Sequence, residues 1–427
     1  MTPEIKNRIE QIRRGEVPEG YKKTRAGIIP LEWQEKDLSD VLKKQTKKNA
    51  DNSVNNVLTN SATRGIIRQT EYFDKQIAND ENKEGYYIVK PGYFVYNPRI
   101  SVGAPCGPFN KYYGETTGIM SPLYTVYKYA DDSQYYSEFL SYYFNSSYWH
   151  KYMYGIANYG ARSDRMNVTS DDMGSLPLPY PSLPEQKKIA EILAAQDRVI
   201  ELYQRKIDEI KKLKKICLSK MFPQKGHNAP EIRFPEFTDA WEQRKLGDIG
   251  SVAMCRRIFK HQTSESGEIP FFKIGTFGGE PDAFITRELF EEFKAKYPYP
   301  DKGDILISAS GSIGRTVEFT GGNEYFQDSN IVWLKHDKSI INPFLRHLYS
   351  VVEWAGIEGS TIKRLYNDNI LKTEVMLPSV QEQTKIAEML DGIDSLITLH
   401  QRKLEELQKS KKALMQLLLT GIVRVNV

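Results

Sequence analysis

The side chains best suited to chemistry in this chain are arginines and lysines that lie beside glycine, serine and asparagine. Arginine can bind a guanine edge through two hydrogen bonds, while lysine, serine and backbone N–H groups hold phosphates. The net charge is only +4, so local clusters must carry any argument for an anionic partner. These clusters indicate contacts to nucleic acid. The candidate contact residues are Arg64, Arg68, Asn97, Arg99, Arg162, Arg165, Arg256, Arg257, Lys260, Ser310, Ser312, Arg315, Lys363 and Arg364.

Patterns typical of an active site are absent or incomplete. Two segments, Asn97-Pro-Arg99 and Asn342-Pro-Phe344, lack the second proline of the Asn/Asp-Pro-Pro-aromatic motif with which amino-methyltransferases hold a target amine. No glycine-rich phosphate loop occurs. Residues 282–294 resemble part of a metal-dependent nuclease site, but 287–296 reads as a helix, whereas such a site needs groups that converge from strands. We therefore expect no catalytic residue and no enzymatic activity in this chain.

Metal-binding and targeting signals are also missing. The six histidines have no ligand spacing, and the three cysteines, Cys106, Cys217 and Cys255, form no CxxC pair. We expect neither a metal site nor a disulfide, which fits a reducing cytoplasm. The N-terminal segment is charged, and no run of about 18 apolar residues occurs, so we expect no signal peptide and no membrane span.

One segment of the chain occurs twice. Residues 185–206 and 382–403 are identical at 13 of 22 positions, at a constant offset of 197. Each copy follows a larger and less similar globular segment, and the entries to those segments, Trp33–Leu38 and Trp241–Leu246, also match in spacing and type. This pattern predicts an internal pseudo-two-fold repeat.

Each repeated segment begins a long helix. Ser182 and Ser379, each followed by glutamate three residues later, have the form of a capping box, in which serine accepts an orphan N–H and glutamate reaches back to the cap. Apolar residues recur every three or four positions, which predicts that the two helices pair as an antiparallel coiled coil. The seam residues are Ile189, Leu193, Ile200, Ile207, Ile386, Leu390, Ile397 and Leu404.

The globular segments read as mixed α/β domains. Runs of β-branched and aromatic residues bounded by glycine and proline, such as 302–308 and 91–97, predict short strands joined by tight turns. The fold class is α+β: two mixed α/β domains joined by two long helices. We place an N-terminal segment at 1–30, the domains at 31–181 and 231–378, and the helices at 182–225 and 379–421.

These features together resemble the specificity subunit of type I restriction–modification systems. The resemblance covers nearly the whole chain and lies in Glu231–Phe237, Gly303–Ser308, Gly311–Gly314 and both Leu-Pro…Glu-Gln-x-Lys-Ile-Ala-Glu-x-Leu helix starts. The first domain departs from this pattern, with Tyr93 in place of the Asp of Gly-Asp-Ile and Ala104 where the second has Arg315.

The resemblance implies two target recognition domains, each of which reads one half of a bipartite double-stranded DNA target, and spacer helices that set the gap. It implies a role in phage defence and docking of two methyltransferase subunits and of restriction/translocase subunits. S-adenosylmethionine, ATP and Mg would bind to those partners, and no cofactor to this chain.

Two alternatives remain open from the residues alone. The runner-up to DNA recognition is a protein–protein scaffold whose domains bind peptides and whose coiled coil serves oligomerisation. The third possibility is a nuclease that acts alone. Salt sensitivity separates the first alternative from DNA recognition, because binding through many phosphates weakens steeply as salt rises. Metal-dependent cutting by the purified chain would favour the nuclease.

Overall fold

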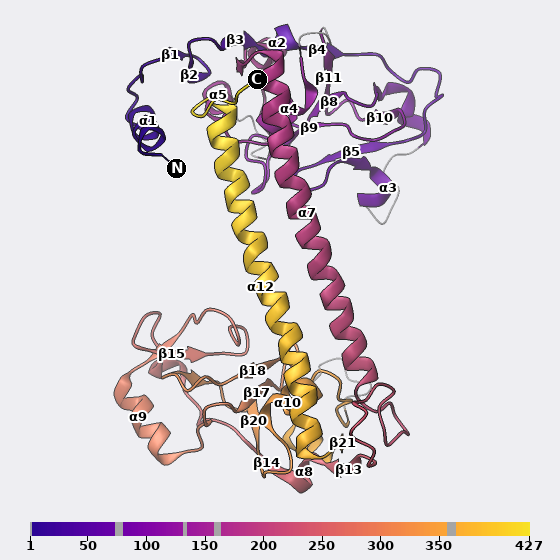
Figure 1. The fold of residues 1–427 in the computed structure, drawn as a ribbon, viewed down its shortest axis with the longest axis vertical. Coiled ribbons are helices and arrows are strands. Elements are labelled where there is room, and N and C mark those ends of the chain that lie inside the picture. The colour runs from indigo at the N-terminus through magenta and orange to yellow at the C-terminus, as the bar shows by residue number, and fades with distance from the viewer. Residues whose placement is uncertain (1, 73–79, 131–134, 158–163, 357–363) are drawn as a thin grey trace. The chain divides into compact units, whose positions relative to one another are not determined.

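The chain folds into two compact units, which we describe separately (Figure 1). The computed structural model describes residues 2–72, 80–130, 135–157, 164–356 and 364–427. The first unit comprises Met1–Leu202 with Leu404–Val427, and the second comprises Tyr203–Lys403. Each unit contains a mixed α/β domain and part of two long helices, α7 (Leu183–Lys220) and α12 (Val380–Leu419). The predicted α+β class and the pair of long helices are confirmed.

The first unit is built on a four-stranded antiparallel sheet in the order β4-β11-β8-β9. These strands are Leu42–Gln45, Thr125–Tyr129, Phe94–Tyr96 and Phe109–Lys111. Aromatic residues of the sheet and of α4 (Ser137–Phe144) fill the core, where the rings of Phe109 and Phe144 stack at 3.9 Å between centroids. The other strands are β1 (Tyr21–Thr24), β2 (Gly27–Pro30), β3 (Gln34–Asp37), β5 (Leu58–Ser61), β6 (Gly65–Arg68), β7 (Tyr87–Val89), β10 (Gly118–Met120) and β12 (Pro177–Tyr180). The other helices are α1 (Pro3–Arg13), α2 (Leu38–Val41), α3 (Gln69–Tyr72), η1 (Asp80–Gly85), α5 (His150–Ile156) and α6 (Ser170–Gly174).

The second unit has a four-stranded sheet with the same connectivity, in the order β14-β20-β17-β18. These strands are Gly250–Ala253, Ile331–His336, Ile305–Ser308 and Thr316–Glu318. The predicted helix at 287–296 is confirmed as α9 (Arg287–Lys296). The other elements are β13 (Glu242–Lys245), α8 (Leu246–Ile249), η2 (Lys260–Gln262), β15 (Ile269–Phe272), β16 (Phe284–Ile285), β19 (Tyr325–Phe326), α10 (Asn342–Leu348), α11 (Asn367–Lys372) and β21 (Glu374–Leu377).

In both units the entry of the domain pairs with its exit. Strand β3 pairs antiparallel with β12, and β13 pairs with β21. Strand β12 leads into α7 and β21 leads into α12. The start of each long helix is therefore anchored to its own domain.

The helix starts follow only half of the predicted capping box. Ser182 and Ser379 accept the N–H groups of Glu185 and Glu382 at 3.4 and 3.3 Å, as expected. The glutamate side chains do not serve the cap. They are 2% and 1% exposed, and a buried carboxylate is stabilised more by a charged donor than by a backbone N–H. The prediction that these glutamates reach back to the cap is wrong.

Each buried glutamate is instead held by a tryptophan and an arginine, an arrangement we call the glutamate clamp. In the first unit Trp33 Nε1 donates to Glu185 Oε2 at 3.0 Å, and the Arg424 guanidinium donates to both carboxylate oxygens at 2.6 and 2.9 Å. In the second unit Trp241 Nε1 donates to Glu382 at 3.3 Å, and Arg233 donates to both oxygens at 2.7 Å.

The C-terminal tail is thus part of the first unit. Besides the Arg424 contact, the carbonyl of Gly421 accepts the Tyr21 hydroxyl at 2.8 Å, and the carbonyl of Ile422 accepts from Arg8 at 2.6 Å. In the second unit, Arg233 and Trp241 both lie in the segment between α7 and β13. In the first unit the equivalent residues are far apart in the sequence, Trp33 and Arg424.

The glutamine after each clamp glutamate fastens a further helix. The Gln186 side chain accepts the N–H of Tyr136, which precedes α4, and the Gln383 side chain accepts the N–H of Ile341, which precedes α10, both at 3.0 Å. Each glutamine also donates at 3.0 Å to the carbonyl of the proline five residues before it. The Glu-Gln pair of the repeat therefore ties each long helix to its domain.

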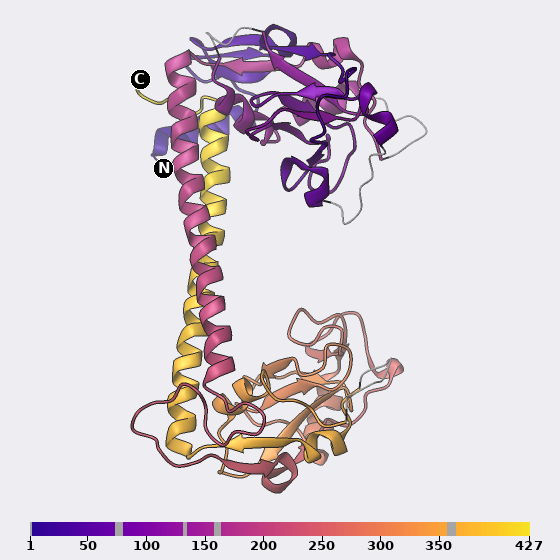
Figure 2. The same cartoon turned by 90° about the vertical axis from the view of Figure 1, so that its right-hand side faces the viewer.

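Within each unit the two long helices lie side by side and run in opposite directions (Figures 1 and 2). In the first unit Ile189 and Leu193 are buried with Leu418 and Leu419. The predicted seam residues Ile207, Ile386 and Leu390 are also buried, whereas Ile200, Ile397 and Leu404 are half-buried. Ile386 and Leu390 belong to the core of the second domain, so the start of that stripe packs against a domain as well. Among the described residues no helix has the length and apolarity needed to cross a membrane.

Candidate nucleic-acid interface

The candidate contacts of the second unit gather around the turn after β17. Ser308 ends this strand, and its hydroxyl donates to the carbonyl of Ser312 and accepts the N–H of Arg315. Gly311 and Gly314 have φ of +66° and +80°, which favours glycine. These bonds and glycines hold the turn in one shape.

Arg364 crosses this turn. Ser310 and Arg364 form an isolated antiparallel bridge, and the next residue, Leu365, donates its N–H to the carbonyl of Ala309 at 2.8 Å. The Arg364 guanidinium donates to the hydroxyl and carbonyl of Ser329 at 3.0 and 3.3 Å. It lies 5.5 Å from the ring centroid of Tyr366, and Tyr366 is 62% exposed. Since the bonds to Ser329 use one guanidinium nitrogen, the remaining donors have no hydrogen-bond partner among the described residues.

A second turn completes this cluster. Ser310 Oγ donates to Asn330 Oδ1 at 2.8 Å, and Arg257 Nε forms an ion pair with Asp328 at 2.9 Å. Ser329, between them, has φ of +51°, a strained value for a residue other than glycine and one that clusters at functional sites. Arg364 and Ser329 line a pocket of about 570 Å³ with Met254, Leu365, Tyr366, Asn367, Asp368 and Asn369.

Arg315 lies beside the same turn and is fixed by different partners. Its guanidinium donates to the carbonyl of Ile274 at 3.1 Å and lies 5.4 Å from the ring centroid of Phe277. Ser312 is exposed. The structure therefore brings together Arg257, Ser310, Ser312, Arg315 and Arg364.

The first unit repeats the crossing. Arg99 and Arg165 form an isolated antiparallel bridge after β8, and the N–H of Met166 donates to the carbonyl of Pro98 at 2.9 Å. Arg99 Nε lies 3.7 Å from a carboxylate oxygen of Asp164. Asn97 donates to the carbonyl of Asn60 at 3.3 Å.

Arg165 and Arg364 thus occupy equivalent positions. Each precedes a buried residue, Met166 or Leu365, whose N–H donates to a carbonyl of the turn, that of Pro98 in the first unit and that of Ala309 in the second. The sequence indicated both arginines separately, but it did not show that they correspond or that Arg99 lies beside Arg165. A bridge between segments so far apart leaves no local signal.

The turn in the first unit is longer than the alignment of the two sequences indicated. Asn97 donates its N–H to Pro108, whereas Ser308 donates to Arg315. The ladders agree, since Tyr96 pairs with Phe109 and Ile307 pairs with Thr316. Pro108 rather than Ala104 is therefore the counterpart of Arg315, because the first turn has four more residues.

The remaining predicted contacts do not join either cluster. Arg64 donates to the carbonyl of Glu71 at 2.8 Å, and Arg68, at the end of β6, lines a polar pocket of about 300 Å³. Arg256 lies over Tyr297 at 5.2 Å, and Lys260 is exposed in η2. Two further candidates, Arg162 and Lys363, lie outside the described residues.

The nuclease-like pattern does not assemble. Glu292 pairs with Lys296 at 2.9 Å on the same helix, and Lys294 lies over the rings of Phe290 and Tyr299. The three cysteines are buried and free, and burial raises the pKa of the Cys255 thiol to about 12. These groups give no support for a metal-dependent nuclease site or a thiolate nucleophile.

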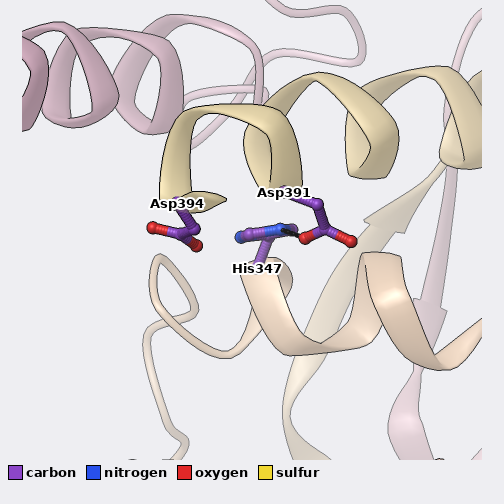
Figure 3. A group of neighbouring side chains, drawn as sticks. All are labelled: His347, Asp391 and Asp394. Atoms are coloured by element: carbon purple, nitrogen blue, oxygen red, sulfur yellow. Dashed lines mark hydrogen bonds and ion pairs between the residues drawn. The ribbon is translucent and has the colours of Figure 1, made fainter. Parts of the chain in front are cut away.

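One group of possible metal ligands does lie together, as Figure 3 shows: His347, Asp391 and Asp394, with one ligand atom of each within 4.8 Å of the others. These side chains already have partners. Asp394 accepts from Lys214 at 2.6 and 2.7 Å, and Asp391 accepts from His347 at 2.6 Å and from Arg346. Burial lowers the pKa of His347, which keeps the imidazole neutral. Two cations already balance the two carboxylates, so we assign no metal to this group.

Comparisons with known proteins agree on one family. The family model of the type I restriction modification DNA specificity domain matches residues 30–212 and 238–409. A putative type I restriction enzyme specificity subunit of Haemophilus influenzae is 44% identical over 237 residues, which span 55% of this chain and 60% of that protein. The putative MjaX specificity subunit of Methanocaldococcus jannaschii is 26% identical over 437 residues, which span 96% of this chain and 97% of that protein.

Two solved structures share the fold. One is a chain in a structure that describes complex assembly and conformational transition of the type I R-M system. It has a TM-score of 0.60 at 16% identity, and the match covers 92% of this chain and 99% of that chain. The type I restriction–modification S subunit of M. genitalium has a TM-score of 0.52 at 14% identity, with 92% and 96% covered. With the family model matching most of the sequence, this chain belongs to the family of type I restriction–modification specificity subunits.

Proposed function

We propose that this chain recognises DNA for a type I restriction–modification complex and that each globular domain reads one half of a bipartite target. One observation carries the proposal: an arginine crosses the turn after the central strand in both units, Arg165 in one and Arg364 in the other. The family model also matches both halves of the chain separately. Two similar readers in one chain suit a target with two halves.

The target recognition domains in this proposal are residues 31–181 and 231–378, with an N-terminal segment at 1–30 and spacer helices at 182–225 and 379–421. Each domain would place its arginine cluster in the major groove, where a guanidinium can bind a guanine edge through two hydrogen bonds. Arg364 retains donors for this purpose and Tyr366 offers an exposed ring beside it. Arg99 and Arg257, at 69% and 60% exposure, suit phosphate contacts that fix the register.

The long helices would act as a stiff spacer, organised as an antiparallel coiled coil with pseudo-two-fold symmetry. Helix α7 has 38 residues and α12 has 40. At about 1.5 Å per residue, each is roughly 57–60 Å long. The 197-residue offset of the repeated segments supports the pseudo-symmetry.

The expected partners are two methyltransferase subunits and restriction/translocase subunits. The exposed apolar pair Val199 and Leu202 on α7 recurs, at the same offset, as Leu396 and Leu399 on α12. Two similar apolar patches suit two copies of one partner. S-adenosylmethionine, ATP and Mg would bind to those partners, the chain itself would do no chemistry, and the complex would serve phage defence in the cytoplasm.

Substitution of Arg364 tests the reading of DNA. In the complex with its methyltransferase, Arg364→Ala should cost about 1–3 kcal/mol for the half-site read by the second domain, or roughly 5- to 150-fold in affinity. Arg165→Ala should affect the other half-site only. Fluorescence anisotropy with duplexes altered in one half-site measures both effects, and Arg14→Ala, which removes an exposed residue of α1's C-cap, is the control.

A salt series on the same duplexes separates the alternatives. DNA recognition predicts that the logarithm of the association constant falls steeply and linearly with the logarithm of salt concentration. Affinity for DNA that is undetectable at low salt, with the complex intact, would favour the peptide-binding scaffold.

A further inference from the structure

Two equivalent ion pairs link the long helices. Lys411 Nζ lies 2.5 Å from a carboxylate oxygen of Asp197 in the first unit, and Lys214 Nζ lies 2.6 Å from Asp394 in the second. The two aspartates are 197 positions apart (394 − 197), as are the two lysines (411 − 214). Each aspartate thus binds the lysine of the opposite helix, and the two pairs are related by the repeat.

Each pair also contacts its own domain. The Tyr142 hydroxyl of α4 donates to Asp197 at 2.8 Å, and Lys411 lies 5.5 Å from the centroid of the Tyr142 ring. In the second unit one ligand atom of His347, on α10, lies within 4.8 Å of a carboxylate oxygen of Asp394. The same imidazole donates at 2.6 Å to Asp391, one turn earlier on α12 (Figure 3).

Tyr142 and His347 occupy equivalent places. In the first unit the N–H of Tyr136 bonds the buried glutamine, and Tyr142 lies six residues later (142 − 136). In the second unit the N–H of Ile341 bonds the buried glutamine, and His347 lies six residues later (347 − 341). In each unit, therefore, three elements meet at one aspartate–lysine pair: both long helices and a helix of the domain. The group of possible metal ligands is the second unit's form of this junction.

The pairs select one alignment of the helices. A slip of one heptad in either direction would place Lys411 opposite Ala190 or Gln204, and Lys214 opposite Ala387 or Gln401. Neither lysine would then face a carboxylate at the heptad-related position. Both lysine side chains are only about a quarter exposed, at 25% and 24%, so loss of the partner is not fully compensated by water. The apolar stripe alone repeats with the heptad and tolerates such a slip better.

We propose that Asp197–Lys411 and Lys214–Asp394 are positioning residues that fix the register of the helix pair and so the number of base pairs between the two half-sites. This inference rests on the proposed function. It assigns the accuracy of the gap to two ion pairs rather than to helix length alone.

The test measures gap preference in the methyltransferase complex. Its target and gap are first determined from the methylation pattern, and duplexes with that gap or with one to three base pairs more or less are then compared for binding and methylation. This range is used because a slip of seven residues at about 1.5 Å each spans about three base pairs of about 3.4 Å. Lys411→Asp, which places two aspartates together, should reduce the preference for the native gap by about fivefold or more, the effect of a pair worth about 1 kcal/mol. Lys214→Asp should act similarly, and the half-site sequences should not change.

The charge swap Asp197→Lys with Lys411→Asp restores the pair and should restore most of the gap preference. Tm, measured on the same variants, separates a loss of gap preference from a loss of stability. The exposed neighbour Lys412→Asp makes the same charge change outside the pair and should leave the preference intact. If Lys411→Asp prevents folding, Lys411→Met removes the charge while keeping the apolar stem.

The inference is overturned if folded Lys411→Asp and Lys411→Met complexes keep the native gap preference, or if Lys412→Asp lowers it equally. Failure of the proposed function gives a different result, because the unmodified complex would then show no bipartite target and no gap preference.

Discussion

Removal of Arg424 probes the role of the C-terminal tail. This arginine is the cationic partner of Glu185, a carboxylate that is 2% exposed. In Arg424→Ala the carboxylate keeps the Trp33 indole N–H at 3.0 Å and loses both guanidinium bonds. Its negative charge is then buried without a counterion.

The size of the effect follows from the burial of each partner. Removing one member of a buried ion pair costs about 3–5 kcal/mol. Because Arg424 is 38% exposed, water can reach part of the vacated space, and we expect about 2–3 kcal/mol. Arg233, the equivalent residue, is 15% exposed, so Arg233→Ala should cost more, about 3–4 kcal/mol. For units of this size these losses lower Tm by about 5–12 °C.

Differential scanning fluorimetry of the purified chain measures the shift, with chemical unfolding to convert it into a free energy. Arg14→Ala is the matched control, since its pair with Glu10 is 66% and 63% exposed and should contribute less than about 0.5 kcal/mol. Glu185→Gln added to Arg424→Ala removes the buried charge and should recover about half of the loss. A shift for Arg424→Ala no larger than that for Arg14→Ala would refute the clamp as a source of stability.

Three further predictions concern single groups. Burial lowers the pKa of His347, so its imidazole binds a proton more readily in the unfolded chain; unfolding followed against pH should show stability decline as pH falls below about 6.5, and His347→Gln should reduce that decline. Because Lys214 and Arg346 already balance the carboxylates beside His347, neither zinc nor a chelator should move Tm by more than about 1 °C; a rise of several degrees with zinc would contradict this. Gly107 has φ of +77° and an added Cβ would lie 2.0 Å from the carbonyl oxygen of Asn97, so Gly107→Ala should cost more than about 2 kcal/mol in urea unfolding. Gly155→Ala, in α5 with nothing within 4 Å, should instead stabilise by about 0.5–1 kcal/mol.

The long helices could be predicted because their signals are local. Apolar spacing, a serine cap and the repeated segment all lie within a few turns of one another, and α7 and α12 begin at Leu183 and Val380, next to the predicted caps. The mixed α/β character of the domains followed from strand and turn patterns in the same way.

The contacts that complete each domain could not be predicted, because they join distant segments. Glu185 and Arg424 are 239 residues apart, and nothing in the last residues of the chain indicates a buried partner. No local signal indicates either that Tyr21 and Arg8, in the N-terminal segment, hold the C-terminal tail. Glu185 and Glu382 could either bond the helix cap or accept from distant side chains. The local Ser-x-x-Glu motif indicated the cap, whereas the structure shows the distant tryptophan and arginine as partners.

In the candidate site, too, the local features could be predicted and the contacts between distant segments could not. Residue type and neighbouring glycines identified Arg99, Arg165, Ser310 and Arg364 as candidates, but not their pairing across the two turns. The difference in length between the turns after β8 and β17 could not be predicted from the sequence either, so Ala104 rather than Pro108 was matched with Arg315. A turn changes length without changing the strands that it joins, so spacing along the chain is a poor guide there.

The proposed recognition of DNA by this chain would give a methyltransferase its DNA target. The most direct test is genome-wide detection of methylated adenine in cells that carry this chain with its neighbouring methyltransferase, compared with cells that lack only this chain. If the chain has this role, we expect a bipartite motif with a fixed gap that disappears when the chain is deleted. An active methyltransferase without such a motif, or a motif that persists after the deletion, would contradict it.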